Sequence, residues 1–301
     1  MGRFRSPQSQ AKFAVSQHLA IGKPRHNQKN DGMIHGIGTA LTHTASLKGV
    51  ATFISDRKLD PIGKGLAGLT IEIATTYLEF RSQQVGQKQL DKDRQAMQIL
   101  LGKKIPVAKS ELTQALESRA YSHFQIQLVS RAQTSKHCSA TRIAEDAGLR
   151  AHELYTLLLT TERAMSPDRQ WSDARFEGRT NFKLYNVTGK GGLNREVAIS
   201  TELAVELESL RLDKSRKVVD REIIYEQHYN IGGGKQWSDS FSKAAQRVLG
   251  WTTGGHGVRH TFAQKRMRTL QSLGNNYDSA LAIVSQEMGH FRPDITEVYL
   301  R

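Results

Sequence analysis

The sequence predicts a mainly α-helical protein with a small antiparallel β-sheet, divided into two domains. The chain has 301 residues, which exceeds the roughly 100–200 residues of a usual single domain. Apolar residues recur at helical spacing over much of its length. Two short alternating segments, 181–187 and 194–199, flank a glycine-rich turn and together predict one β-hairpin.

Residues 1–38 mix Gln, Lys, Asn, His and Gly without a clear period, which predicts a basic arm or linker. No acidic residue precedes Asp31. Such a segment is typical either of an arm that contacts DNA or of a disordered tail, and the sequence favours neither. The candidate DNA-binding residues of this arm are Arg3, Arg5, Lys12, Lys23, Arg25 and Lys29.

Residues 39–105 are predicted to form a compact helical domain. Ile73, Tyr77 and Phe80 share one face of a helix, and a second apolar stripe ends at Gly102. Glycine is favoured at helix C-caps because it accepts a left-handed backbone conformation. This part of the chain is also the more basic one, with a net charge of +9 over residues 1–105.

A second domain is predicted over residues 106–301. Pro106 marks its boundary, and a helical region is expected to start with the segment from Glu111 to Leu128. Residues 139–160 have a strongly apolar helical pattern. Gly148-Leu149-Arg150 interrupts that pattern, which predicts a junction between helices with Arg150 at a helix terminus.

The predicted hairpin would place Lys190 at its glycine-rich tip. Helices are expected to follow at 201–211, 238–249, 257–272 and 277–288. Pro293 would then open a final short helix that carries Tyr299. The charged stretches 161–180 and 213–235 fit either a DNA-contacting role or an insertion, and their sequences do not decide between the two.

Composition favours a polyanionic partner. Lys and Arg number 43 against 29 acidic residues, so the net charge is +14, and neutralising phosphates releases counterions from nucleic acid. Cys138 is the single cysteine, which excludes an intramolecular disulfide and a cysteine-based zinc site. No apolar stretch approaches the roughly 20 residues of a membrane span. We therefore expect a cytoplasmic protein without a membrane partner.

The C-terminal residue pattern suits attack on a phosphodiester. His256-x-x-Arg259 is followed by His290 and then by Tyr299. The transition state carries extra negative charge on its non-bridging oxygens, which two planar guanidiniums can grip bidentately. A tyrosine nucleophile also needs a proton acceptor, and the leaving oxygen needs a proton donor. We expect neither a metal nor a cofactor, because no carboxylate cluster lies at ligand spacing near these histidines.

The chain resembles the tyrosine recombinases, the phage-integrase family, in the order of the residues that match their catalytic set: Arg150, Lys190, His256, Arg259, His290 and Tyr299. The resemblance spans 139–301 and rests on four strings: Gly148-Leu149-Arg150-Ala151-His152-Glu153-Leu154, Thr188-Gly189-Lys190-Gly191, His256 through Phe262, and Met288-Gly289-His290 before Tyr299. It extends more weakly over 39–105. It implies a two-domain architecture, with a helical core-DNA-binding domain and an α+β catalytic domain.

The resemblance also implies a role for each residue. Tyr299 would be the nucleophile that forms a 3′-phosphotyrosyl link, and Arg150 and Arg259 would hold the phosphate. His256 would act as general base or acid, and Lys190 as general acid for the leaving oxygen. His290 would bond a non-bridging oxygen, while Glu153 would orient Arg150 or His256.

The expected function is site-specific recombination or integration of a mobile element. The implied partners are double-stranded DNA of the nucleoid, further copies of the chain in a DNA-bound tetramer, and an accessory DNA-bending or directionality factor. Two alternatives remain open. One is a type IB topoisomerase-like enzyme that nicks and religates a single duplex, and the other is a catalytically idle DNA-binding protein.

Overall fold

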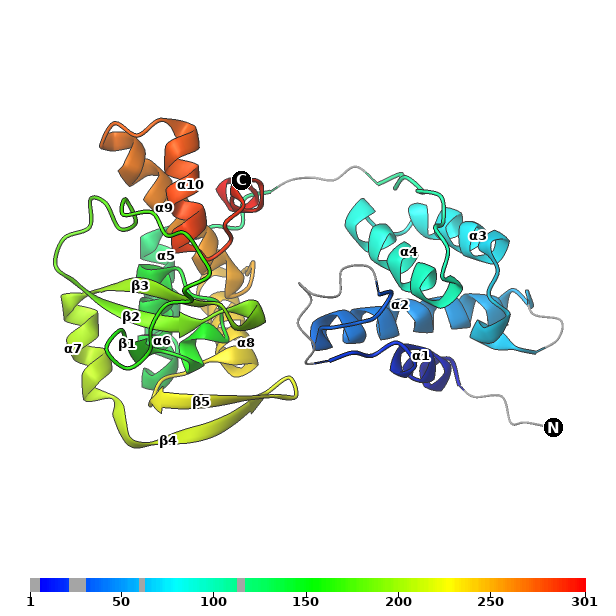
Figure 1. Cartoon of the computed structure of the whole chain (residues 1–301), viewed down its shortest axis with the longest axis horizontal. Helices are drawn as coiled ribbons and strands as arrows, with labels where there is room; N and C mark the ends of the chain where they lie inside the picture. Colours follow the sequence, from blue (N-terminus) through cyan, green and yellow to red (C-terminus); the bar gives the residue numbers. More distant parts are fainter. Residues whose placement is uncertain (1–5, 22–30, 60–62, 113–116) are drawn as a thin grey trace. The chain divides into compact units, whose positions relative to one another are not determined.

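The computed structural model describes residues 6–21, 31–59, 63–112 and 117–301. The chain divides into two compact units, 1–115 and 116–301 (Figure 1). The division therefore falls after residue 115 rather than at the predicted 105/106 boundary. The reason is that the segment after Pro106 still bonds to the N-terminal unit: Ser110 Oγ donates to the Val85 carbonyl (2.7 Å), and its N–H to Gln87 Oε1 (2.9 Å).

The N-terminal unit is helical, as the spacing of its apolar residues predicts. Its elements are α1 (Pro7–Ser16), α2 (Ile37–Asp56), the 3₁₀ turn η2 (Gly65–Gly68), α3 (Ile71–Ser82) and α4 (Gln87–Leu101). Leu47, Val50, Leu78 and Met97 are among the side chains of its buried core. The predicted C-cap after α4 is present, since Gly102 has φ +61°.

Part of the predicted arm is folded. Ser6 caps α1 by accepting a hydrogen bond from the Ser9 N–H (3.3 Å), and Pro7 occupies the first turn. Ala11 and Val15 are buried in the core of the unit, so this helix is not a free tail. Of the candidate DNA-binding residues, Lys12 is exposed on α1. Arg3, Arg5, Lys23, Arg25 and Lys29 lie outside the described residues.

The C-terminal unit combines helices with two small antiparallel sheets, so the predicted fold class is confirmed. Its helices are α5 (His123–Arg131), α6 (Ser135–Ala147), α7 (Thr201–Ser209), α8 (Gly234–Leu249), α9 (His256–Ser272), α10 (Tyr277–Glu287) and α11 (Pro293–Glu297), with 3₁₀ turns η3 (Glu153–Tyr155), η4 (Lys190–Gly192) and η5 (Val298–Leu300). The described ranges contain no helix with both the length and the apolarity to cross a bilayer.

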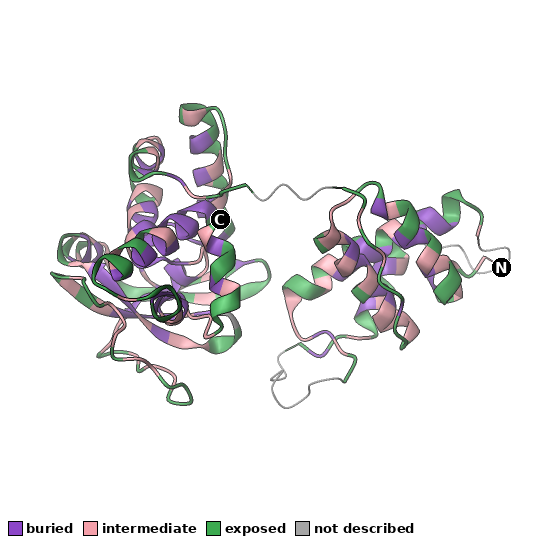
Figure 2. Ribbon diagram, turned by 90° about the horizontal axis from the view of Figure 1, so that it is seen from above, coloured by how far each residue is buried: buried purple, intermediate pink, exposed green. Residues whose placement is uncertain are grey.

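A three-stranded sheet carries the predicted hairpin. Its order is β1 (Leu158–Leu159), β2 (Phe182–Thr188) and β3 (Asn194–Ser200), all antiparallel, with Tyr185 opposite Val197. Tyr185 and Val197 belong to one buried cluster with residues of α6 and α8. In Figure 2 the buried ribbon of this unit lies toward its interior and the exposed ribbon toward its outside. The base of the hairpin thus packs into the core, and Lys190 lies at its tip.

The stretch 213–235 contains most of a second hairpin, which the sequence analysis did not predict. Strands β4 (Arg211–Asp220) and β5 (Ile223–Tyr229) pair antiparallel and turn at Arg221 and Glu222, both with positive φ. Asp220 Oδ1 accepts the Lys235 N–H (2.9 Å) at the start of α8. A further difference concerns α5, which begins at His123 rather than near Glu111, because Ser122 forms a capping box there.

The stretch 161–180 contains no helix or strand and packs against the C-terminal end of α10. The Ser172 N–H donates to Gln286 Oε1 (2.7 Å), and the Phe176 N–H donates to Glu287 Oε1 (2.8 Å). The Trp171 ring lies 4.7 Å from that of Phe291. This long connection between β1 and β2 therefore supports the turn that follows α10.

Candidate active site

Arg150 is presented by a sharp turn at the end of α6. Gly148 ends that helix with φ +62°, in the left-handed region that glycine tolerates, and an added Cβ would lie 2.4 Å from the Phe262 ring. The predicted junction at 148–150 is therefore present. Arg150 Nη1 donates to Glu153 Oε1 (2.7 Å), and its backbone N–H to Glu153 Oε2 (2.8 Å). Glu153 thus fixes the backbone and the guanidinium of Arg150 together.

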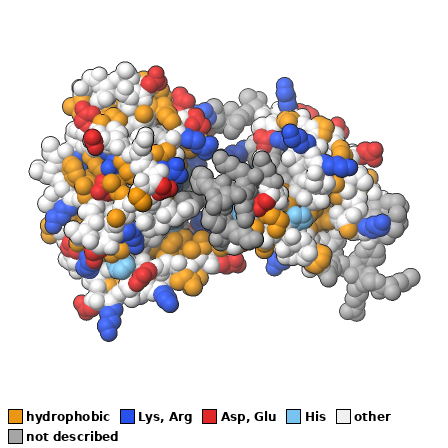
Figure 3. Space-filling view, viewed as in Figure 1, with side chains coloured by type: hydrophobic (Ala, Val, Ile, Leu, Met, Phe, Trp, Pro, Cys, Tyr) orange, Lys and Arg blue, Asp and Glu red, His pale blue; other side chains and the backbone are white. Residues whose placement is uncertain are grey.

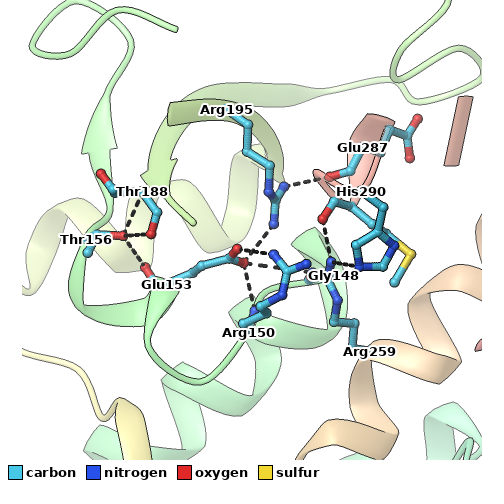
Figure 4. Close-up of polar contacts among 10 residues, drawn as sticks. Gly148, Arg150, Glu153, Thr156, Thr188, Arg195, Arg259, Glu287 and His290 are labelled. Carbon is cyan, nitrogen blue, oxygen red and sulfur yellow. Dashed lines mark hydrogen bonds and ion pairs between the residues drawn. The ribbon is translucent and has the colours of Figure 1, made fainter. Parts of the chain in front are cut away.

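Glu153 is fully buried and lies among guanidinium groups (Figure 4). Besides Arg150, its Oε2 accepts from Arg195 Nη2 (2.8 Å) and lies 3.8 Å from Arg259 Nη1. Burial opposes ionisation of this carboxyl, but the charges of Arg195, Arg150 and Arg259 outweigh it and hold the pKa of Glu153 well below its usual range. The carboxylate is therefore charged at neutral pH.

Arg259 joins the ends of two helices. It is fully buried on α9 and donates to the carbonyls of Gly148, after α6, and Met288, after α10. Terminal carbonyls have no partner within their own helix, so an arginine satisfies them well. Burial and the charge of Arg150 lower the pKa of Arg259 to about 9, which leaves it cationic at neutral pH.

The Lys190 hairpin reaches the same carboxylate through its backbone. A Cβ added to Gly189 would lie 3.3 Å from Glu153 Oε1 and 3.8 Å from Arg150 Nη1. The hairpin is closed by the Gly189 N–H, which donates to the Leu193 carbonyl (2.7 Å). Lys190 begins the 3₁₀ turn η4 at this tip, and its side chain lies outside the described part of the structure.

Tyr299 lies on η5 and packs against three histidines of its own chain. Its ring centroid is 5.3 Å from that of His256, 4.7 Å from that of His260 and 5.2 Å from that of His290. The guanidinium carbon of Arg259 is 5.7 Å from the tyrosine ring centroid. The C-terminal turn is also tied to α9, since Gln264 Nε2 donates to the Arg301 carbonyl (3.1 Å).

The three histidines are held neutral. Desolvation and the charge of Arg259 lower the pKa of His290, and its Nε2 lies 3.3 Å from Arg259 Nη2. Because that contact requires Nε2 to accept, Nδ1 carries the proton and donates to Thr296 Oγ1 (3.0 Å). Burial lowers the pKa of His260 to about 4, and desolvation and Arg259 also lower that of His256, which still reaches solvent.

Four separate segments of the chain thus bring together Arg150, His256, Arg259, His290 and Tyr299. Glu153 bonds Arg150. The residue that sequence reasoning missed is Arg195, which is fully buried on β3. A signal was present, because alternation along the strand places residue 195 on the same inward face as Val197 and Ile199. His260, which the sequence analysis did not single out, also faces Tyr299.

The described residues hold no group of three His, Cys, Asp or Glu side chains suited to a metal ion. The site instead combines positively charged arginines with neutral histidines and a tyrosine. Its arginines suit a bound phosphate, its tyrosine can act as a nucleophile, and its neutral histidines can accept a proton.

The chain superposes over its whole length on the XerH site-specific recombinase bound to palindromic difH substrate in a post-cleavage complex, with a TM-score of 0.56, 12% identity and 94% of that chain covered. It has the fold of the tyrosine recombinases. A lambda integrase dimer bound to a COC′ core site matches 98% of this chain and 76% of its own, with a TM-score of 0.54 and 13% identity. The two-domain tyrosine-recombinase architecture predicted above is thereby confirmed. No family model and no curated protein matches the sequence.

Proposed function

We propose that this chain is a site-specific DNA recombinase that cuts and rejoins double-stranded DNA through a 3′-phosphotyrosyl intermediate on Tyr299. The observation that carries the proposal is the packing of Tyr299 against His256, His290 and Arg259, with Arg150 held nearby by Glu153. The tyrosine-recombinase fold supports the same conclusion. The XerH and lambda integrase structures that share this fold are complexes with DNA.

In the proposed reaction, the Tyr299 hydroxyl attacks the scissile phosphorus and the bond from phosphorus to the 5′-oxygen breaks. His256, neutral at pH 7, takes the phenolic proton, and Lys190 gives a proton to the departing 5′-oxygen. Arg150 and Arg259 neutralise the charge that develops on the non-bridging oxygens, and His290 bonds one of them. A 5′-hydroxyl of another strand reverses the step, so the bond energy is retained in the adduct and no ATP is consumed.

In this proposal each of the two units has its own role. The helical N-terminal unit binds DNA, together with the basic residues of the first thirty positions, and the C-terminal unit performs catalysis. Lys and Arg side chains are distributed over the visible face of both units (Figure 3), as expected for proteins that neutralise many phosphates.

Exchange between two duplexes needs four cleavages, so we propose a DNA-bound tetramer that integrates or excises a mobile element, aided by an accessory DNA-bending or directionality factor.

The test is adduct formation on nicked suicide duplexes drawn from DNA that flanks the encoding gene. The full chain is expected to form a covalent adduct, visible on a denaturing gel. Tyr299→Phe is expected to form none and yet to bind the same duplex with nearly unchanged affinity, since one hydroxyl adds little to an interface dominated by phosphate contacts. An adduct formed by Tyr299→Phe would exclude Tyr299 as the nucleophile.

Two rival functions predict different products. A type IB topoisomerase-like enzyme would also form the adduct, but it would relax supercoiled circles without joining two duplexes. A catalytically idle DNA-binding protein would bind tightly and form no adduct. The converged arrangement of Arg150, Arg259 and Tyr299 favours a catalyst over the idle protein, because binding alone does not require a phenol packed against neutral histidines.

A further inference from the structure

Arg195 is a buried arginine that the proposed chemistry does not use. It lies on β3 with none of its surface exposed. Its Nη2 donates to Glu153 Oε2 (2.8 Å), and its Nη1 donates to the carbonyl of Glu287 (2.6 Å), as Figure 4 shows. Burying a guanidinium is costly unless both its charge and its donors are satisfied. These two partners satisfy its charge and two of its donors and so allow the residue to occupy the core, whereas its buried Nε has no hydrogen-bond partner among the described residues.

Each partner of Arg195 holds one side of the candidate active site. Glu153 is the carboxylate that fixes both the backbone and the guanidinium of Arg150. Glu287 is the last residue of α10, directly before Met288, whose carbonyl is bound by Arg259. His290 lies on the turn that follows. One planar side chain thus connects the support of Arg150 to the turn that carries His290.

The fit around Arg195 leaves little freedom. Gly289 has φ +68°, and an added Cβ would lie 2.7 Å from Arg195 Cδ. The backbone of the turn before His290 therefore rests directly on the arginine side chain. Glu287 is itself fixed, because its carboxylate accepts two hydrogen bonds from Arg266 on α9 (2.7 and 2.8 Å). A change at residue 195 would consequently be transmitted to both sides of the site.

We propose that Arg195 is a positioning residue that sets the spacing between Arg150 and the His290 turn by holding Glu153 and the Glu287 carbonyl at once. This inference rests on the proposed function of the site. Arg195 acts through Glu153 on Arg150 and through α10 on His290. Its loss would displace the groups that neutralise charge on the non-bridging oxygens, while the tyrosine and the general acid would keep their chemistry.

The test compares two substrates with one set of full-length variants. Single-turnover cleavage is measured on a nicked duplex with an ordinary scissile phosphate and on the same duplex with a methylphosphonate, in which a neutral methyl group replaces one non-bridging oxygen. The methylphosphonate transition state carries less negative charge, so it depends less on the arginines. Arg195→Met removes both donors at similar volume. Arg195→Lys keeps the charge but cannot reach both partners with a planar fork.

Arg195→Met is expected to cleave the ordinary phosphate at least ~100-fold more slowly than the unmodified chain, the loss typical of a displaced charge-stabilising donor. On the methylphosphonate the loss is expected to shrink at least ~10-fold, because less charge has to be neutralised. Arg195→Lys is expected to fall between, and the DNA affinity of both variants to stay within about threefold, because Arg195 is buried and makes no phosphate contact.

Arg179→Met is the matched control, because Arg179 is also largely buried and ion-paired, to Asp146 (2.9 Å), but bonds neither Glu153 nor Glu287. It is expected to lower the Tm and to leave the ratio of rates on the two substrates at its original value. Equal losses on both substrates for Arg195→Lys and Arg195→Met, or no loss at all, would overturn the positioning role. If the unmodified chain forms no adduct, the proposed function fails first, which is a distinguishable result.

Discussion

Glu153 shows how one buried carboxylate organises several functional groups. Its two oxygens bond Arg150 and Arg195 and lie near Arg259. Three guanidiniums thus oppose a single negative charge, and the cluster keeps a net positive charge for a bound phosphate. The cations remain close together because each is also fixed by a backbone carbonyl or by the carboxylate itself. Pre-organisation of this kind is what stabilisation of a phosphoryl transition state requires.

Arg259→Lys tests the arginine that contacts both helix ends. An ammonium cannot reach the Gly148 and Met288 carbonyls together or grip a phosphate bidentately. We expect cleavage of the suicide duplex to fall by about 100-fold or more, with binding retained.

Arg179→Lys is the control for that substitution, since Arg179 also bonds a helix end, at the carbonyl and side chain of Asp146 (2.7 and 2.9 Å). It is expected to cleave nearly as well as the unmodified chain. Near-normal cleavage by Arg259→Lys would remove Arg259 from the phosphate site.

The neutral histidines predict a fall in stability in mild acid. The folded chain lowers the pKa of His260 to about 4 and lowers that of His290 as well, so the unfolded chain binds more protons below its own histidine pKa of about 6.5. The contribution of these histidines to the free energy of unfolding is therefore fully present above that pH and is lost as the pH falls toward 4. For His260 the loss is on the order of 2 kcal/mol. Glu153 adds a loss of the same sign at the acid end of this window, because its pKa is depressed in the folded chain and the unfolded carboxyl, with an ordinary pKa of 4.5, binds protons first.

Urea denaturation of the full chain between pH 7.5 and 4.5, monitored by the transition of the C-terminal unit, measures this dependence. His260→Asn, which has no charge to gain, is expected to flatten the profile. A free energy of unfolding that stays constant across this range would show that these histidines are not kept neutral by the fold.

At the scale of elements, the site depends on how α6, α9, α10 and the β2–β3 hairpin end. The proposed groups lie at a helix C-cap, a hairpin tip, a helix start and two turns, where backbone groups are unpaired and side chains can bond them. Gly148 is closely packed at one of these positions, because its backbone is left-handed and the Phe262 ring occupies the space of a Cβ.

Gly148→Ala is expected to destabilise the C-terminal unit by about 2 kcal/mol or more, from left-handed strain together with steric overlap, and to slow cleavage through Arg150. Gly102→Ala is its control, since Gly102 has a similar φ of +61° at the end of α4 but nothing within 4 Å of an added Cβ. It should cost the N-terminal unit only about 1 kcal/mol. Chemical denaturation measures both, and equal costs would contradict the close packing at Gly148.

Local signals were sufficient for most elements of the site. Gly148 and Gly102 mark helix ends, and the alternation around Gly189 and Gly191 marks the hairpin, because each signal reflects a local backbone requirement. The β4–β5 hairpin escaped because charged residues interrupt the alternation of β4 and its turn residues, Arg221 and Glu222, are unusual at positive φ. The ion pair between Arg195 and Glu153 joins residues distant in sequence, so no local pattern contains it.

At the scale of the whole molecule, Tyr299 packs into the site of its own chain. Each protomer of a DNA-bound assembly would then carry a complete set of the groups proposed for cleavage. Subunits would need one another for synapsis and exchange, and not for supplying the nucleophile. The hydrogen bond from Gln264 on α9 to the Tyr299 carbonyl (3.5 Å), within one chain, is compatible with this arrangement.

A mixing experiment tests this arrangement. Tyr299→Phe and Arg259→Ala chains, each inactive alone, are combined on one duplex that carries two binding sites. If the nucleophile acts within its own chain, every protomer lacks one required group, and the mixture is expected to remain inactive. Adduct formation by the mixture above the level of either variant alone would show that Tyr299 is delivered to a neighbouring protomer.

The measurement that tests the central claim most directly is the chemical identity of the adduct. The full chain is incubated with a nicked suicide duplex, digested with protease, and the DNA-linked peptide is sequenced by mass spectrometry, while the released DNA end is assayed with polynucleotide kinase. We predict a peptide that contains Tyr299 joined to a 3′-phosphate, together with a free 5′-hydroxyl end that the kinase labels. An adduct on another residue, or a 5′-phosphate linkage, would contradict the assignment of Tyr299 and its surrounding arginines and histidines as the active site.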